Sequence, residues 1–379
     1  MHSARGLAMK SCDVEVRGAG IVGSCLALSL ARLGLSVRLQ GEPMSNMAGP
    51  DVRAFALNAA SVRLLQDLKV WADLPVHSRT PVREMAVQGD APGSMLEFSA
   101  WQQRLGELAW IVDAPALEAA LSAALRYAPH VEQVSDSNPV AQSGVALTAL
   151  CEGKHSSSRS GLGVTVDRRD YGHSAIAARV CADAPHHGRA RQWFRAPDIL
   201  ALLPFDMPTP GHSYAIVWSM PDQQKEELMQ LPDAEFAARL SDAAGERLIL
   251  VSRRACWPLG RAEAQRWCGP GWVLLGDAAH VVHPLAGQGL NLGLADVATL
   301  TRVVAEREPW RSLGDEKLLR RYVRERAAPT QAMTLVTDGL LNLFSHPDPI
   351  LRELRNRGLG LVNRLAPLKR WLADRALDS

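Results

Sequence analysis

The chain has 379 residues, of which 47% are hydrophobic and 22% are charged, and its formal net charge is +2. This length suggests about two domains with a large core, and the small net charge argues against a nucleic-acid binder with a broad basic surface. The six cysteines are scattered, without a C-x-x-C pair, which favours reduced thiols in a cytoplasmic protein and no metal site.

The first elements follow the order strand, glycine-rich turn, helix, strand. We expect strands at residues 14–16 and 36–40 and a helix at 24–34, with Gly18-Ala19-Gly20-Ile21-Val22-Gly23 between the first strand and the helix. In such a G-x-G-x-x-G turn the first two glycines let the backbone approach a pyrophosphate, and the third lets the helix pack on the strand. A tight turn without a ligand is the alternative interpretation.

The second strand ends on an unusual residue. An acid that binds ribose hydroxyls commonly stands there, whereas this chain has Gln40, followed by Glu42. An amide still hydrogen-bonds a hydroxyl, without the charge-assisted strength of a carboxylate. Within residues 51–71, the apolar side chains from Ala56 to Leu68 have the spacing of a helix. Arg53 stands just before this helix, either as a solvated charge or as a contact for a phosphate or ring edge.

The middle of the chain is rich in predicted strands. We expect strands at 82–87, 95–98, 109–112, 145–150, 174–181, 190–195, 199–205, 212–220 and 247–252, and helices at 114–127 and 233–244. The prediction is an α/β fold: a discontinuous Rossmann-like domain at 10–81, 111–173 and 262–345, an inserted, mostly antiparallel β-sheet domain at 82–110 and 174–261, and a helical C-terminal segment at 346–379.

The stretch 271–296 carries the strongest signal. An apolar strand at 272–275 ends at Gly276-Asp277, and Gly287-Gln288-Gly289 then leads into a helix. A helix N-terminus offers free N–H groups and a positive dipole end, so we expect an electron-rich group there. His280 and His283 have no evident third metal ligand, so we interpret them as loop residues.

The C-terminal residues 350–377 combine leucines with seven basic and two acidic side chains. Such a basic amphipathic segment can lie on a membrane surface. Gly358, Gly360 and Pro367 interrupt it, which favours packing on the nucleotide domain instead. We therefore expect a cytoplasmic protein, and contact with the inner membrane or a biosynthetic complex stays open.

These motifs together resemble the flavin-dependent aromatic hydroxylases of the p-hydroxybenzoate hydroxylase fold, and within them the ubiquinone-biosynthesis hydroxylases of the UbiH/VisC type. The resemblance rests on the glycine-rich turn, on DVRAFALNAASVRLL, on ILALLPF and above all on GDAAHVVHPLAGQGLNLGLAD. It implies an FAD-dependent monooxygenase that hydroxylates a prenylated phenol with NAD(P)H and O₂. The alternative is a weakly active or inactive relative that serves as a binding partner in a quinone-biosynthesis complex.

The resemblance also implies the site residues. Pro284 and Arg53 are the predicted catalytic residues, Pro284 against the reactive face of the flavin and Arg53 near the flavin and phosphates. The predicted pocket lining is Leu202, Leu203, Pro204 and Phe205, with ordinary sheet core as the alternative. The predicted FAD contacts are Gly18, Gly20, Gly23, Gln40, Arg53, Glu152, Gly153, Gly276, Asp277, Pro284, Gly287, Gln288, Gly289, Leu290 and Asn291.

Two residues in the adenosine half depart from the family pattern. Gln40 replaces the ribose-binding acid, and Glu152-Gly153 replaces an Asp-Gly pair. The region before the second departure, residues 130–149, is also short for the strands of this fold. We expect any weakening of FAD binding to arise in this half.

Overall fold

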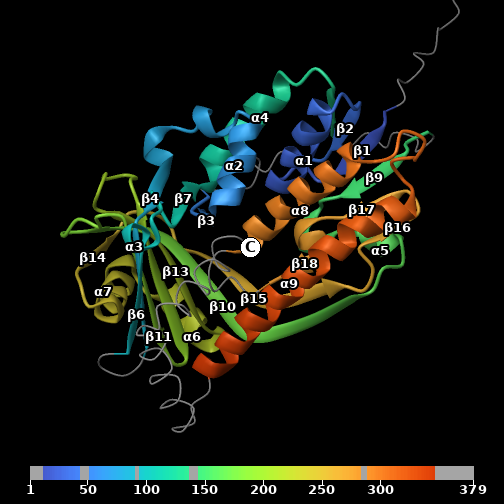
Figure 1. Ribbon diagram of the computed structural model, residues 1–379. Coiled ribbons are helices and arrows are strands. Elements are labelled where there is room, and N and C mark those ends of the chain that lie inside the picture. Colours follow the sequence, from blue (N-terminus) through green and yellow to red (C-terminus); the bar gives the residue numbers. More distant parts are fainter. Residues whose placement is uncertain (1–11, 43–50, 90–93, 136–143, 283–287, 346–379) are drawn as a thin grey trace, which may run out of the picture.

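The computed structural model describes residues 12–42, 51–89, 94–135, 144–282 and 288–345. These residues form two large β-sheets, a small sheet between them and helices that cover both large sheets (Figure 1). The α/β fold class with an inserted sheet and a helical C-terminal part is confirmed.

The first large sheet has the strand order β16-β17-β9-β1-β2-β8. Apart from the β16–β17 pair, its pairings are parallel. Its strands are β1 Val14–Arg17, β2 Val37–Gln40, β8 Val131–Val134, β9 Leu147–Leu150, β16 Cys268–Gly269 and β17 Trp272–Leu274. The helices of this half are α1 Ile21–Arg32, α2 Ala59–Asp67, α4 Ala114–Arg126, α5 Ser157–Gly161, α8 Gln288–Ala305 and α9 Glu316–Ser345.

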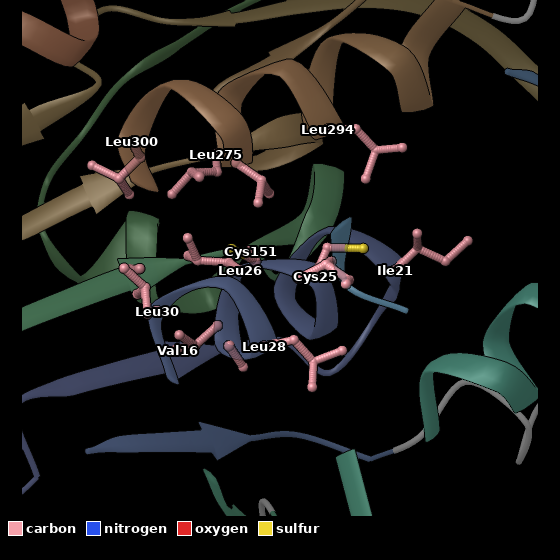
Figure 2. Packing of buried hydrophobic residues seen from close by; sticks show 14 of the residues in the cluster. Val16, Ile21, Cys25, Leu26, Leu28, Leu30, Cys151, Leu275, Leu294 and Leu300 are labelled. Carbon is pink, nitrogen blue, oxygen red and sulfur yellow. The ribbon is translucent and has the colours of Figure 1, made fainter. Parts of the chain in front are cut away.

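One apolar core holds α1, α2, α4, α8 and α9 on the parallel sheet. Figure 2 shows Cys25 and Leu26 on the side of α1 that faces Leu294 of α8, with Cys151, which directly follows β9, beside them. Every residue of α1 from Gly23 to Ala31 is buried, as expected for a helix that packs on the sheet and on a second helix. Burial of this apolar surface is the main stabilising term for the half that carries the glycine-rich turn.

The second large sheet has the order β18-β15-β10-β13-β12-β11-β5-β6, with β14 paired to β10. Its strands are β5 Glu84–Gln88, β6 Met95–Ser99, β10 Val166–Ala182, β11 Arg189–Arg195, β12 Asp198–Phe205, β13 Ser213–Pro221, β14 Leu248–Leu250, β15 Ala255–Ala264 and β18 His280–Val281. Most of its pairings are antiparallel, and α6 Asp222–Gln230 and α7 Asp233–Ala244 share an apolar cluster with one of its faces.

The small sheet joins the two halves. It consists of β3 Ala54–Leu57, β7 Ala109–Asp113 and β4 Arg79–Val82, in that order. The remaining short helices are α3 Ala100–Gln103, η2 Trp71–Asp73, η3 Val76–Ser78, η4 Gly153–His155 and η5 Gly276–Ala278.

The expected start of the second helix, at about Ala56, is wrong. Residues 54–57 form strand β3, paired with β7, and the helix α2 begins only at Ala59. Asn58 causes this change, because its side chain accepts a hydrogen bond from the Ser61 N–H at 2.8 Å and caps the helix. Apolar spacing alone does not reveal that boundary.

The strand expected at 174–181 is longer in the structure. β10 begins at Val166, and its first residues pair with the end of β15. This extension is mostly exposed and charged, so it lacks the alternation that predicts a strand. β10 thereby crosses the boundary predicted at residue 173, and our division into domains remains a proposal.

Candidate functional site

The glycine-rich turn is shaped by close backbone contacts. A Cβ atom at Gly18, whose φ is +102°, would lie 2.4 Å from the Cys151 carbonyl oxygen. A Cβ atom at Gly23 would lie 1.9 Å from the Gly18 carbonyl oxygen. The residue before α1, Gly20, offers no side chain to cap the helix, so the first N–H groups of α1 remain open to a ligand.

Gln40 ends β2 beside this turn. Its carbonyl oxygen accepts a hydrogen bond from the Gly18 N–H at 2.7 Å. Its half-buried side chain makes no hydrogen bond within the described part of the chain, so the amide is free to bind a ligand hydroxyl. The structure thus places Gln40 where the sequence predicted it.

The side chain of Glu152 is occupied by its own loop. It accepts hydrogen bonds from the Ser156 hydroxyl and from the N–H and hydroxyl of Ser158, the last at 2.8 Å. Arg17 donates to the same Ser158 hydroxyl at 3.1 Å. This carboxylate therefore orders the loop after β9, and direct contact of Glu152 or Gly153 with a cofactor stays a prediction.

Arg159 is a structural residue that the sequence did not reveal. It is 2% exposed and donates from Nη1 to the Ala278 carbonyl oxygen at 2.7 Å and from Nη2 to the Lys154 carbonyl oxygen at 3.0 Å. It ties the loop after β9 to η5. Its position in a serine-rich stretch resembles that of a surface residue, and no local signal marks it as buried.

Asp277 lies in η5, directly after β17. The residue reaches solvent, but the protein around it removes part of the hydration of its carboxyl group. This desolvation raises the pKa of Asp277. It has no hydrogen-bond partner among the described residues. A carboxylate in this position is available to accept hydrogen bonds from ligand hydroxyls.

Three elements meet directly beside Asp277. A Cβ atom at Gly276 would lie 3.3 Å from Val22 of α1, and one at Gly293 of α8 would lie 2.7 Å from Val22. The glycines let the turn after β17, α1 and α8 approach one another. The glycine-rich turn at 18–23 and the stretch 271–296, which are far apart in the sequence, are thus neighbours in the structure.

A buried ion-pair network fixes this junction. The Asp296 carboxylate of α8 accepts hydrogen bonds from the Gly276 N–H at 2.9 Å, His280 Nε2 at 2.7 Å and Arg326 Nε at 2.7 Å. Burial alone would raise the pKa of Asp296, but His280 and Arg326 lower it. The interpretation of His280 as a loop residue is wrong, because it lies buried in β18, with its ring 4.9 Å from that of Trp267.

Asn291 positions the start of α8. Its Nδ2 donates to the Ala56 carbonyl oxygen at 2.8 Å, and its Oδ1 accepts from the Asn58 N–H at 3.1 Å and the Ser61 hydroxyl at 2.7 Å. The side chain therefore holds the segment 56–61 against the helix. Gln288, Gly289 and Leu290 lie in the first turn of α8, whereas Pro284 and Gly287 lie outside the described residues.

Residues 146–337 match the family model described as an FAD binding domain. The ubiquinone hydroxylase UbiL of Rhodospirillum rubrum is 31% identical over 99% of this chain and 91% of its own length. The 3-demethoxyubiquinol 3-hydroxylase of Escherichia coli is 31% identical over 96% of this chain and 98% of its own length. The chain belongs to the FAD-dependent hydroxylases of ubiquinone biosynthesis. The predicted family is confirmed.

Solved structures share the fold of this hydroxylase. PqsL of Pseudomonas aeruginosa, in complex with 2-aminobenzoylacetate, superposes with a TM-score of 0.74 at 22% identity, covering 93% of this chain and 100% of that one. The p-nitrophenol 4-monooxygenase PnpA of Pseudomonas putida gives a TM-score of 0.73 at 18% identity, covering 97% and 98%. These likenesses show the fold alone.

The residues present fit the FAD of this family. A Cβ atom at Gly18 or Gly23 would collide with backbone, so this tight turn needs glycine at both positions. The start of α1 is open, and Asp277 has no partner within the described chain. The hydroxylase is therefore an FAD-dependent monooxygenase. That its cofactor site is built from the two glycine-containing motifs stays a prediction. No helix within the described ranges is long and apolar enough to cross a membrane.

Arg53 lies within a cluster of carboxylates in this hydroxylase. Its guanidinium pairs with Asp51 and, at 3.1 Å, with Glu118. Burial opposes the charge, yet these two carboxylates raise the pKa of Arg53. A simple solvated charge does not describe this arrangement, and the predicted contact with flavin or phosphates stays a prediction.

The predicted pocket residues of β12 divide between the two sheet faces. Leu202 is fully buried in the cluster that α6 and α7 share with the sheet. Leu203 and Phe205 pack in a different cluster, with Ala54 and Ala56 of β3. Because successive side chains of a strand point to opposite faces, Pro204 lies on the same face of β12 as Leu202. Leu203 and Phe205 are thus on the face toward the cofactor-binding half.

Proposed function

We propose that this hydroxylase adds a hydroxyl group to the aromatic ring of a prenylated phenol intermediate of ubiquinone biosynthesis, using NAD(P)H and O₂. The relatives named above support this substrate class, one as a ubiquinone hydroxylase and one as a 3-demethoxyubiquinol 3-hydroxylase. The observation that carries the proposal is the junction of α1, η5 and α8 around Asp277, ordered by the buried Asp296 network.

The residues of the cofactor site would have distinct roles. Gly18, Gly20 and the open start of α1 would hold the pyrophosphate, and Asp277 would accept hydrogen bonds from ribityl hydroxyls. Gln40 would bind a ribose hydroxyl. The first turn of α8 would stabilise negative charge at the edge of the flavin ring, because helix N-termini favour anions.

Bound FAD, reduced by NAD(P)H, supplies the oxygen-transfer chemistry. The protein contributes orientation and exclusion of water, and the sheet face with Leu203 and Phe205 would cover the substrate ring. The packing of Arg53 against Asp51 and Glu118 would hold the segment before β3 in place. We retain Pro284 as the residue predicted to lie against the flavin.

Genetic complementation tests this substrate class. The gene would be expressed in bacterial strains that are each blocked at one ring-hydroxylation step, and the quinone intermediates would be identified by mass spectrometry. We expect one block to be relieved, with loss of its accumulated phenol. Failure to relieve any block, by a protein that carries FAD, would contradict the proposed substrate class.

We also propose that residues 346–379, which lie outside the described residues, contact a membrane surface or a biosynthetic complex. The excess of basic side chains in 350–377 supports this proposal. Co-sedimentation of the full chain with anionic vesicles tests it. We expect binding that a chain ending at residue 345 loses, and equal sedimentation of the two chains would contradict a membrane role.

A further inference from the structure

Arg179 is a buried cation on the sheet face toward the cofactor-binding half. Its neighbours in β10, Ala178 and Val180, point into the cluster shared with α6 and α7, so Arg179 points to the opposite face. The strand register places it in one row with Ala215 of β13 and Leu203 of β12. The residue is 7% exposed.

One half of the guanidinium joins the two parts of the molecule. Arg179 Nη2 donates to Asp113 Oδ1 at 2.9 Å and to the Arg53 carbonyl oxygen at 2.7 Å. The guanidinium carbon lies 3.9 Å from the centre of the Phe205 ring. These contacts fix Arg179 against β7, against the segment before β3 and against β12.

The second terminal nitrogen of the guanidinium, Nη1, has no hydrogen-bond partner among the described residues. Nη1 is buried and makes no hydrogen bond in the described structure. Burial lowers the pKa of Arg179 to about 10, and the carboxylates of Asp113 and Asp51 offset this effect only in part. Desolvation, and not a lack of counter-charge, is thus the main cause of the lowered pKa.

The structural contacts of Arg179 leave Nη1 unused. The connection between the two halves uses Nη2 alone, and a buried donor without an acceptor destabilises a fold. Besides the carboxylates of Asp113 and Asp51, the side chains around it on this face are small or apolar, among them Ala177, Ala215, Leu203 and Phe205. Such surroundings suit a flat aromatic ring that brings its own oxygen acceptor.

We propose that Arg179 is a substrate-binding residue, whose Nη1 donates to the anionic oxygen of a phenolate ring held beside Phe205. This inference rests on the proposed function, because it names the form in which that substrate is bound. A phenolate is richer in electrons on its ring carbons than the neutral phenol. Arg179 would therefore select the ring oxygen that activates the carbon to be hydroxylated.

Two dyes that differ in one methyl group test the proposal. The FAD-loaded full chain is dialysed at one neutral pH against 4-nitrophenol, which ionises, or against 4-nitroanisole, which does not. The variants are Arg179→Met and Arg179→Lys. Arg191→Met is the matched control, because Arg191 is also an ion-paired arginine of this sheet but lies in the row of Leu202, on the opposite face.

We expect Arg179→Met to weaken binding of 4-nitrophenol about 10- to 100-fold, the scale of one charge-assisted hydrogen bond, and to leave binding of 4-nitroanisole unchanged. Arg179→Lys should keep part of the preference for the phenol, and Arg191→Met should keep all of it. A wild-type chain without preference for 4-nitrophenol, or an equal loss of both dyes in both Arg179 variants, would overturn the proposal.

Flavin absorbance of the same samples separates this inference from the proposed function. A wild-type chain that takes up no FAD would contradict the proposed function, and titration of that chain with the two dyes would still decide the role of Arg179. A chain that holds FAD but shows no preference between the dyes would overturn the role of Arg179 alone.

Discussion

His280 Nε2 lies 2.7 Å from the Asp296 carboxylate, and neither residue is exposed to solvent by more than 4%. Because Asp296 also binds the Gly276 N–H and Arg326, this one carboxylate connects β18, η5 and α9 to α8. The glycine-rich junction beside Asp277 depends on that connection. The network therefore supports the cofactor site without belonging to its surface.

Removing the charge of Asp296 should destabilise the protein strongly. Asp296→Asn leaves Arg326 buried without a counter-charge, a change that typically costs about 3–5 kcal/mol. The free energy of unfolding in urea measures this effect. The control is Glu306→Gln, which breaks an exposed ion pair with Arg302 and should cost less than about 1 kcal/mol. Equal losses in both variants would contradict the role of the network.

The same carboxylate predicts a dependence on pH. The folded protein lowers the pKa of Asp296 below its unfolded value, so its contribution to stability is complete above the ordinary range for aspartate and is lost as the pH falls through the folded pKa. Unfolding midpoints between neutral and strongly acidic pH should therefore fall less steeply for Asp296→Asn than for the wild type. Parallel profiles would count against this assignment.

Removing the charge of Asp277, in contrast to Asp296, should stabilise the cofactor-free protein and weaken cofactor binding. Burial raises its pKa, so ionised Asp277 disfavours the folded, cofactor-free chain at neutral pH. Asp277→Asn should raise the melting temperature of the cofactor-free protein and weaken FAD binding about 10-fold or more, as loss of a charged acceptor does. A variant that binds FAD as tightly as the wild type would remove Asp277 from the cofactor site.

The third glycine of the turn gives a steric prediction. The Cβ atom of Gly23→Ala would clash with the Gly18 carbonyl oxygen, so α1 must move away from the turn. We expect FAD binding, measured by flavin fluorescence, to be lost, together with a drop in melting temperature. Gly106→Ala is the control, because a Cβ atom there meets nothing within 4 Å. Normal flavin content in Gly23→Ala would contradict the proposed pyrophosphate site.

Gln40 offers a gain-of-affinity test. Gln40→Glu replaces a neutral acceptor by a charged one at the end of β2, and a charge-assisted hydrogen bond is about twice as strong as a neutral one. The dissociation constant of FAD should fall about 3- to 10-fold in the variant. An unchanged or weaker affinity would show that Gln40 does not bind the ribose.

The sequence predicts the βαβ opening and the stretch 271–296 well, because glycine spacing and strand–helix periodicity are local properties. The buried contacts of Asn58, Arg159 and Asn291 could not be found in this way, although the family resemblance marks Asn291 itself as an FAD contact. Their partners are backbone groups up to 235 residues distant, or a helix boundary that apolar spacing does not mark. Strand alternation separates Leu202 from Leu203, but only the apolar clusters of the folded protein show which of the two faces α6 and α7.

Isotope transfer tests the central claim most directly. The FAD-loaded chain would be given NAD(P)H, a prenylated phenol and ¹⁸O₂, and the product would be analysed by mass spectrometry. We predict a ring-hydroxylated product that carries one ¹⁸O atom, formed only in the presence of FAD. Oxidation of NAD(P)H without ¹⁸O in the ring, with any of the phenols that accumulate in the blocked strains, would contradict the assignment as a hydroxylase.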